Sequence, residues 1–217
     1  MKKKYLVGVD LGTSSTKAAL YQINGKRIAQ SSSDVPINYQ KQGVVEQQNE
    51  DFFNTAALTV RTCIEDSGID PREVAAIAFD SQMAGVGLVD EHFNPVAKFD
   101  SWLDMRCQQY IEKLDRESGD RVTRLTGCPP TCDHGPKMLW WKHERPEIYQ
   151  KTAKFIMPGT YVAAHLAQLK YDQAYIDHTY IHFSGFSDAK KGKWSTELCT
   201  KYGLDINKLP IIVDPCD

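Results

Sequence analysis

Apolar residues in the first part of the chain come in short runs that are separated by turn-forming residues. Residues 5–9 form one apolar run and residues 16–21 a second, with Asp10, Gly12, Thr13 and Ser14 between them. Short apolar runs bounded by glycine and small polar residues are typical of strands joined by a tight turn. A further turn is indicated by the Asn-Gly pair at 24–25, so residues 27–33 are predicted to add a third strand to the same meander.

The spacing of apolar residues then becomes helical. Residues 34–47 contain a proline, a glycine and many polar side chains, and are predicted to be a loop. Residues 50–67 carry apolar side chains at mostly helical spacing, with Asn49 expected as the N-cap and Gly68 as the end. The short apolar run at 74–79 is predicted to be a buried strand. Another strand is expected at 86–89, and a turn at 91–94.

The second half is predicted to be mainly helical. Pro146 should interrupt one helical stretch, and Ser195 should cap the last helix. The expected helices cover residues 104–117, 137–144, 147–151, 160–169 and 196–202. Three strands, a helix and then more strands differ from the simple alternation of a doubly wound sheet. The order predicts an α/β fold in which a mixed sheet is flanked by helices.

Composition narrows the class of protein. The chain has 217 residues, a net charge of -2 and 41% hydrophobic residues, which is enough for a sizeable core. The near-neutral charge argues against nucleic acid as the main partner. The apolar run at 5–9 is too short for a signal peptide, and no stretch approaches the roughly 20 apolar residues that span a bilayer. We therefore expect a cytoplasmic protein that binds neither nucleic acid nor membranes.

The six cysteines are scattered, and a cytosolic chain keeps its thiols reduced. Cys128 and Cys132, with His134 nearby, suggest a metal site, but there is no second ligand pair at zinc-finger spacing. Free thiols on a loop are the expectation, and zinc is the alternative.

The turn between the first two strands carries the candidate chemistry. Gly12 allows φ > 0 and a close approach of the backbone to a ligand. Successive backbone N–H groups in such a turn bind anions, and the hydroxyls of Thr13 and Ser14 add donors. Asp10 is suited to hold Mg²⁺, directly or through water. These residues predict a site for a Mg²⁺-bound phosphate chain, and an ordinary hairpin is the alternative. The turn is not a P-loop, because G-x-x-x-x-G-K-[ST] is missing and Lys17 falls within a strand.

Several motifs, in order along the chain, resemble one family. The D-x-G-T-x-x-x-K of residues 10–17 resembles the first phosphate motif of the actin-like ATPase and sugar-kinase superfamily. Residues 77–85, I-A-F-D-S-Q-M-A-G, are similar to the G-Q-M-H-G motif of FGGY carbohydrate kinases, especially pentulose kinases. Residues 101–106, S-W-L-D-M-R, resemble that family's W-x-D-x-R, and the stretches 46–47, 136–149 and 176–194 also agree. The resemblance implies an RNase H-like (actin-like ATPase) fold, here the N-terminal FGGY domain, similar to that of xylulose kinases.

The resemblance also implies an activity and a set of site residues. It implies ATP-dependent phosphorylation of a sugar or polyol hydroxyl, with ATP and Mg²⁺ as cofactors and a homodimer of the full-length enzyme. Transferred residue by residue, Asp10 would assist the metal, and the transferring phosphate would face Gly12, Thr13 and Ser14. The sugar would be bound by Gln82, Met83, Ala84, Trp102, Asp104 and Asp177.

Other roles stay open for several of these residues. Trp102 is alternatively a core residue, Asp104 an N-cap, and Met83 a packing residue. Asp177 alternatively only holds a loop. A pairing of Arg106 with a carboxylate is expected rather than contact with sugar, and Trp140 and Trp141 are expected in the core.

The chain also departs from the family pattern. Ala84 stands where many pentulose kinases have a histidine that donates to a sugar hydroxyl, which puts D-xylulose in doubt. The family's general base is an aspartate in a G-x-x-D segment, and neither Asp214 nor Asp217 lies in one. We expect residues 1–217 to be the N-terminal domain of a longer kinase, without the second, nucleotide-binding domain and inactive alone. The alternatives are a non-catalytic sugar- or nucleotide-binding module of the same fold, or a different actin-like ATPase, which would not account for Q-M-A-G.

Overall fold

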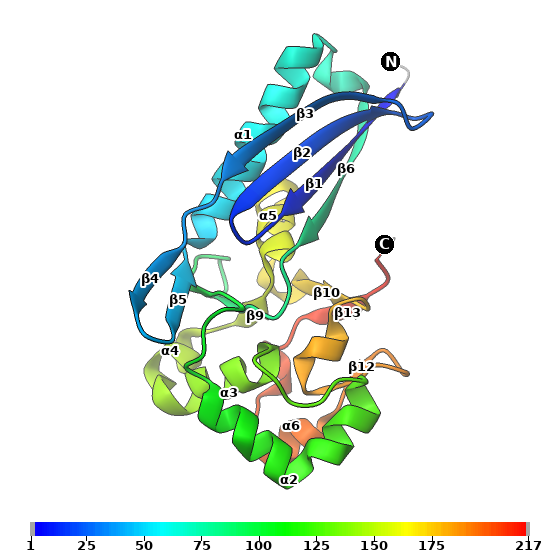
Figure 1. Cartoon of the computed structure of the whole chain (residues 1–217). Coiled ribbons are helices and arrows are strands. Elements are labelled where there is room, and N and C mark those ends of the chain that lie inside the picture. The colour runs from blue at the N-terminus through cyan, green and yellow to red at the C-terminus, as the bar shows by residue number, and fades with distance from the viewer. Residues whose placement is uncertain (1–2, 216–217) are drawn as a thin grey trace.

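A computed structural model describes residues 3–215, so Cys216 and Asp217 lie outside the described residues. A sheet with one long helix forms one end of the molecule, and most of the shorter helices form the other end (Figure 1). The sheet has the order β3-β2-β1-β6, with strands β1 (Tyr5–Leu11), β2 (Ser15–Gln22), β3 (Arg27–Asp34) and β6 (Val74–Ser81). β1, β2 and β3 are antiparallel neighbours and β6 is parallel to β1, which confirms the mixed sheet and the predicted meander.

Helix α1 (Asn49–Ser67) covers one face of this sheet. Val7, Val9 and Leu11 alternate along β1 and are buried against it, which follows from the two-residue period of a strand. Gly68 ends the helix in the left-handed conformation, as predicted. The predicted N-cap is wrong, because Gln48 occupies that position. The buried Asn49 amide instead donates to the carbonyl of Ala97 at 3.1 Å.

Two further predictions about strands are wrong. The expected loop at 34–47 contains β4 (Asn38–Lys41) and β5 (Val44–Gln47), which form a three-stranded sheet with β8 (Phe99–Asp100). The polar residues of this segment gave no sign of strands, because the partners that allow Glu46 and Gln47 to be buried lie on distant segments. The run at 74–79 is a strand, but most of β6 is exposed, because it lies at the edge of the sheet.

The other end of the molecule contains most of the remaining elements. Pro146 separates two helices and Ser195 caps the last one, with its hydroxyl accepting from the Leu198 amide at 3.3 Å, both as predicted. The helices at this end are α2 (Gln108–Thr126), α3 (His134–Glu144), α4 (Pro146–Lys151) and α6 (Thr196–Tyr202), whereas α5 (Pro158–Ala167) packs against α1 and β6 at the sheet (Figure 1). The short strands pair as β7 (Gly87–Val89) with β9 (Lys154–Ile156), β10 (Tyr175–Asp177) with β13 (Ile211–Val213), and β11 (Ser187–Asp188) with β12 (Lys193–Trp194).

The helix predicted at 104–117 begins later and is longer than expected. Cys107 is the N-cap of α2, and residues 102–106 form a turn before it. The prediction of Asp104 as N-cap is therefore wrong. Its carboxylate accepts from the Arg106 amide at 3.1 Å, and this local turn keeps the chain out of the helix.

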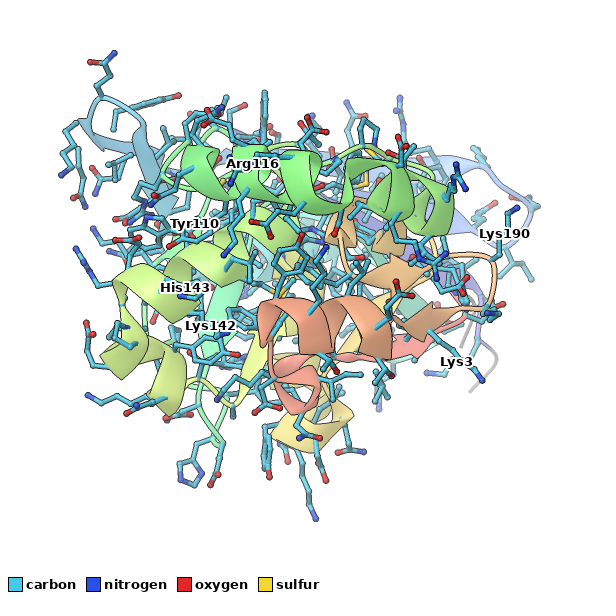
Figure 2. The ribbon with its side chains drawn as sticks, turned by 90° about the horizontal axis from the view of Figure 1, so that it is seen from below. Lys3, Tyr110, Arg116, Lys142, His143 and Lys190 are labelled. Atoms are coloured by element: carbon cyan, nitrogen blue, oxygen red, sulfur yellow. The ribbon has the colours of Figure 1, made fainter. Side chains whose placement is uncertain are left out.

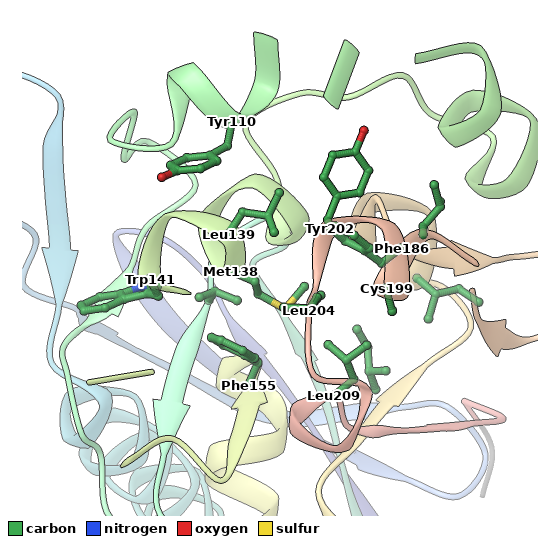
Figure 3. Packing of buried hydrophobic residues seen from close by; sticks show 14 of the residues in the cluster. Tyr110, Met138, Leu139, Trp141, Phe155, Phe186, Cys199, Tyr202, Leu204 and Leu209 are labelled. Atoms are coloured by element: carbon green, nitrogen blue, oxygen red, sulfur yellow. The ribbon is translucent and has the colours of Figure 1, made fainter. Parts of the chain in front are cut away.

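The larger core lies between these helices. Figure 3 shows Leu139, Phe155, Phe186 and Tyr202 from separate segments packed into one cluster. The buried Tyr110 ring stacks on the exposed His143 ring with centroids 5.5 Å apart, whereas Arg116 and Lys190 are exposed to solvent (Figure 2). Within residues 3–215, no helix is long and apolar enough to cross a membrane.

Candidate functional site

The turn after β1 and the segment after β6 lie at the same edge of the sheet. The two strands are parallel neighbours, with Leu11 opposite Ser81, so their carboxyl ends meet. The amide of Gln82 donates to the Leu11 carbonyl at 2.9 Å and extends the pairing into the segment that follows β6. This register brings Q-M-A-G beside the turn that carries Thr13.

A closed chain of hydrogen bonds joins this turn to three other segments. The indole N–H of Trp102 donates to the Thr13 hydroxyl at 2.9 Å, and that hydroxyl lies 3.4 Å from Oε1 of Gln82. The Gln82 amide donates to Oε1 of Gln47 at 2.9 Å, and the Gln47 amide donates to the Thr13 carbonyl at 2.9 Å. Gln47, which sequence analysis gave no role, therefore closes the ring and fixes the orientation of the other side chains.

These residues border an open pocket of about 670 Å³. At its rim three large apolar side chains are partly exposed: Met83 at 41%, Trp102 at 46% and Met105 at 43%. The pocket is lined by Thr13, Gln82, Met83, Ala84, Trp102, Leu103, Met105, Thr131, Cys132 and Phe183. Apolar walls with a few fixed polar groups suit a small polyhydroxylated molecule, whose C–H faces pack on aromatic rings. The exposure of Trp102 shows that it is not a core residue.

Ala84 has a strained backbone in this pocket. Its φ is +62°, a region that residues with a side chain seldom occupy. The next residue must be glycine, because a Cβ on Gly85 would lie 2.3 Å from the Phe99 ring and 2.6 Å from the Asp100 carbonyl. Strain of this kind persists where the surroundings impose it, often at binding sites.

Asp104 does not line the pocket. Its buried carboxylate accepts from the Val45 amide at 2.9 Å and pairs with Nε of Arg106 at 2.9 Å. Arg106 also pairs with Asp100 at 2.6 Å and with Glu46 at 3.0 Å, which confirms its expected pairing with carboxylates. The network holds the segment that carries Trp102 against β5 and β8.

Two tryptophans complete this network. Trp141 is buried and its indole donates to Asp100 at 2.5 Å, and the Arg106 guanidinium lies 4.6 Å from the Trp140 ring centre. Both tryptophans are thus part of the packing, as predicted. Burial raises the pKa of Asp100 to about 7, although the charge of Arg106 opposes this.

The turn itself differs in detail from the expectation. Gly12 has no positive φ, and glycine is required because a Cβ would lie 2.8 Å from the Ser15 carbonyl. The Gly12 amide donates to that carbonyl at 3.1 Å, and Ser14 has an exposed side chain. Asp10 points to the opposite face of the sheet from Val9, where its carboxylate lies 3.6 Å from Nζ of Lys17.

Asp10 and its cross-strand neighbour Asp80 line a second open hollow of about 670 Å³ on the uncovered face of the sheet. Among the described residues there is no group of three or more His, Cys, Asp or Glu side chains placed to hold a metal. Two exposed carboxylates nevertheless fit Mg²⁺, which keeps several waters and takes one or two protein carboxylates. Asp10 and Asp80 are therefore the residues that could hold it.

Known proteins similar to this chain identify its family. Residues 5–215 match the N-terminal domain of the FGGY family of carbohydrate kinases. The chain belongs to the FGGY family. A xylulose kinase from Bacillus subtilis (strain 168) is 28% identical over 223 residues, and a gluconokinase from the same organism is 27% identical over 212 residues.

Solved FGGY structures share the actin-like fold. Gluconate kinase from Lactobacillus acidophilus superimposes with a TM-score of 0.90 at 26% identity, and the match covers 99% of this chain and 42% of that one. Ligand-bound xylulose kinase from the same organism gives a TM-score of 0.87 at 27% identity. The chain spans 42% of the length of the Bacillus xylulose kinase, of which it matches the N-terminal part.

Asp177, which the FGGY resemblance places at the sugar site, lies apart from the pocket. Its carboxylate accepts from the amide and hydroxyl of Thr179 at 2.7 and 2.5 Å, and so it holds a turn. The nearby Tyr180 is buried. Its hydroxyl donates to the Ser81 carbonyl at 2.5 Å and links this turn to the end of β6.

Five pocket residues were not predicted: Leu103, Met105, Thr131, Cys132 and Phe183. Cys132 was considered only as a free thiol or zinc ligand, together with Cys128 and His134. In the structure it instead faces Cys107, 25 residues away, with the two sulfurs 3.8 Å apart. Spacing within the 128–134 loop gives no sign of this contact.

Proposed function

We propose that this chain forms the sugar-binding part of an ATP-dependent kinase that phosphorylates a hydroxyl of a sugar or polyol. One observation carries the proposal: the ring of Thr13, Gln47 and Gln82, with Trp102 hydrogen-bonded to Thr13, fixes an apolar pocket directly beside the turn of the phosphate motif. The family and its named relatives, which are xylulose and gluconate kinases, support a carbohydrate substrate.

The proposed roles follow from where each side chain points. Gln82, Met83, Ala84 and Trp102 contact the sugar, because they line the pocket. Asp104 positions Trp102 from behind through Arg106, and Asp177 only holds its turn. Since the Ala84 methyl group cannot donate a hydrogen bond, the substrate must be held at that position by van der Waals contact.

The phosphate turn lies between two hollows. Thr13 borders the pocket, whereas Asp10 borders the hollow on the uncovered face of the sheet. We place the transferring phosphate of ATP at Gly12, Thr13 and Ser14, between the two. ATP supplies the phosphoryl group, and Asp10 with Asp80 would hold the Mg²⁺ that accompanies it. Residues of this chain thus orient the acceptor hydroxyl toward the turn.

We further propose that turnover needs segments of FGGY kinases other than the matched stretch, including the aspartate general base. The support is that the chain covers 42% of the length of the Bacillus xylulose kinase. The chain alone should then release no ADP in a sugar-dependent assay. A cytoplasmic location, where ATP is available, and a homodimer of the complete kinase are also proposals. Sedimentation of the complete kinase tests the homodimer.

The test is a thermal-shift screen with D-xylulose, L-xylulose, gluconate, glycerol, erythritol and ATP-Mg. A ligand that binds only the folded state raises the unfolding midpoint. We expect a shift with one sugar class, weakened in Met83→Ser and unchanged in Leu58→Ser, which removes another exposed apolar side chain, on α1. A shift with ATP-Mg and none with any sugar would overturn the proposal in favour of a general actin-like ATPase.

A further inference from the structure

Three side chains from separate segments meet behind the pocket. Sγ of Cys132, in the loop before α3, lies 3.8 Å from Sγ of Cys107 at the start of α2. Nζ of Lys137, in the first turn of α3, lies 3.0 Å from Cys132 and 4.0 Å from Cys107. Cys107 and Lys137 are buried, whereas Cys132 is partly exposed and lines the pocket.

Lys137 is a buried cation whose charge favours the thiolate form of a cysteine beside it. Its ammonium donates to the Asp104 carbonyl at 2.7 Å. Burial by itself would lower the pKa of Lys137, but the interactions with Cys107 and Cys132 outweigh burial and raise it. A hydrogen bond from Cys107 and the charge of Lys137 lower the pKa of Cys132, while that of Cys107 is raised. Cys132 is thus the nucleophile of the pair, because the thiolate is the reactive form.

The distance between the sulfurs allows a bond after a small movement. A disulfide has an S–S length of about 2.05 Å, so the sulfurs must approach by about 1.8 Å. Redox-sensitive cysteines are low in pKa, accessible and close to a second cysteine that resolves the oxidised form. Cys132 meets the first two conditions from the pocket side, and the buried Cys107 meets the third.

We propose that Cys132 is a peroxide-reactive thiol that forms a reversible disulfide with Cys107. The Cys132 thiolate attacks one oxygen of hydrogen peroxide, the O–O bond breaks, and a sulfenic acid and hydroxide form. The Cys107 sulfur then attacks the sulfenic sulfur, the S–O bond breaks, and the oxygen leaves as water with the thiol proton. In total, two thiols lose two electrons and two protons, and one peroxide is reduced to two waters.

The disulfide would act on the segment that carries Trp102. Cys132 lies 2.9 Å from the Asp104 carbonyl and 3.7 Å from that of Trp102, and Cys107 directly follows this segment. Drawing the two sulfurs together moves this wall, so sugar binding should weaken. That consequence rests on the proposed function, whereas the disulfide itself does not.

The test uses the whole chain with Cys216→Ser, treated with hydrogen peroxide, alkylated, digested and analysed by mass spectrometry. We expect a peptide linked through Cys107 and Cys132 that dithiothreitol separates. Cys128→Ser is the matched control, because Cys128 lies in the same loop and is partly exposed, but burial raises its pKa. This variant should still form the link, whereas Cys132→Ser should not. In the parent chain at pH 7, alkylation should be several-fold faster at Cys132 than at Cys128.

A second variant keeps the test independent of any single substitution. Cys107→Ala should stop the link and leave a sulfenic acid at Cys132 that dimedone traps. Equal oxidation of Cys128 and Cys132, or sulfinic acid at Cys132 with Cys107 still reduced, would overturn the proposal. If the disulfide forms but oxidised and reduced protein show the same thermal shift with sugar, the proposed movement of the pocket wall is wrong. If reduced protein shows no thermal shift with any sugar, the proposed function fails. The mass spectrum still shows whether the disulfide forms.

Discussion

The sheet end and the segment from β8 to α3 are held together by different forces. Between the sheet and α1, the buried side chains are uncharged: most are apolar, such as Val7, Leu20 and Phe52, and the others are threonines. Between β8 and α3, charged groups are buried instead: Asp100, Asp104, Asp133 and Lys137, with Arg106 nearly so. Apolar burial is non-directional and leaves a regular pattern in the sequence, whereas charged pairs need particular partners. The pocket wall therefore depends on a few directional contacts.

This second region is also incompletely paired. Oδ1 of Asp133 and both ring nitrogens of His134 are buried, and the described chain offers them no hydrogen-bond partner. Such groups carry a desolvation cost that a pair would offset. The region should therefore respond to substitution and to pH more strongly than the sheet does.

The largest effect is expected for Arg106→Leu. Removing the guanidinium leaves the buried Asp100 and Asp104 without their cation, which costs about 3–5 kcal/mol of unfolding free energy. Urea unfolding of the variant and the parent chain measures this loss of stability. Arg145→Leu is the control, because Arg145 also lies over Trp140 but is exposed, and it should change stability by less than about 0.5 kcal/mol. A loss below about 1 kcal/mol in Arg106→Leu would show that the network contributes little.

The next effect is a pH dependence that belongs to His134. Burial lowers its pKa to about 3, so below pH 6.5 the unfolded chain binds a proton that the folded chain cannot. The contribution of the neutral His134 to the free energy of unfolding is complete above pH 6.5 and falls as the pH drops toward 3. The linkage predicts a loss of roughly 2–3 kcal/mol between pH 7 and pH 4.5.

His134→Leu should remove that part of the pH dependence, measured by urea unfolding across pH 4.5–7. His92→Gln is the control, because the His92 side chain is exposed, and it should keep the slope of the parent chain. Equal slopes for the parent chain and His134→Leu would contradict the assignment.

A smaller effect separates binding from stability at Trp102. Trp102→Phe and Trp194→Phe each remove one indole hydrogen bond, to Thr13 and to the Pro210 carbonyl, and should each cost about 1 kcal/mol. Trp102→Phe alone should also reduce the thermal shift with sugar, because Trp194 lies away from the pocket. An equal sugar response in the two variants would remove Trp102 from the binding site.

The smallest effect has opposite signs at a pocket residue and at a residue of the sheet. Ala84→Gly should stabilise the chain by about 0.5–1 kcal/mol, because glycine takes φ of +62° without strain. Ala19→Gly removes the same methyl group from β2, where glycine should destabilise by a similar amount. Thermal unfolding of both variants gives the two signs, and a destabilising Ala84→Gly would show that the methyl contact outweighs the strain.

Sequence patterns predicted the sheet region better than the pocket wall. The meander, α1 and Gly68 followed from periodicity and turn residues, which act locally. β4 and β5 were missed because Glu46 and Gln47 are buried by partners far along the chain. The same reason applies to Asp104, whose carboxylate faces Val45 and Arg106 rather than the pocket. Gln82, Met83, Ala84 and Trp102 were grouped from motifs, but the hydrogen bonds that link Gln82 and Trp102 through Thr13 and Gln47 are visible only in three dimensions.

The parallel pairing of β1 with β6 also bears on the order in which the molecule folds. It joins residues 5–11 to residues 74–81, whereas β1, β2 and β3 pair with near neighbours in the chain. Closing a long loop costs conformational entropy before contacts reward it, so non-local pairing is slow. We therefore expect amides of the meander to gain protection from hydrogen exchange before the Gln82 amide does. The pocket, which needs both strand ends, would then be among the last parts of the chain to acquire its native form.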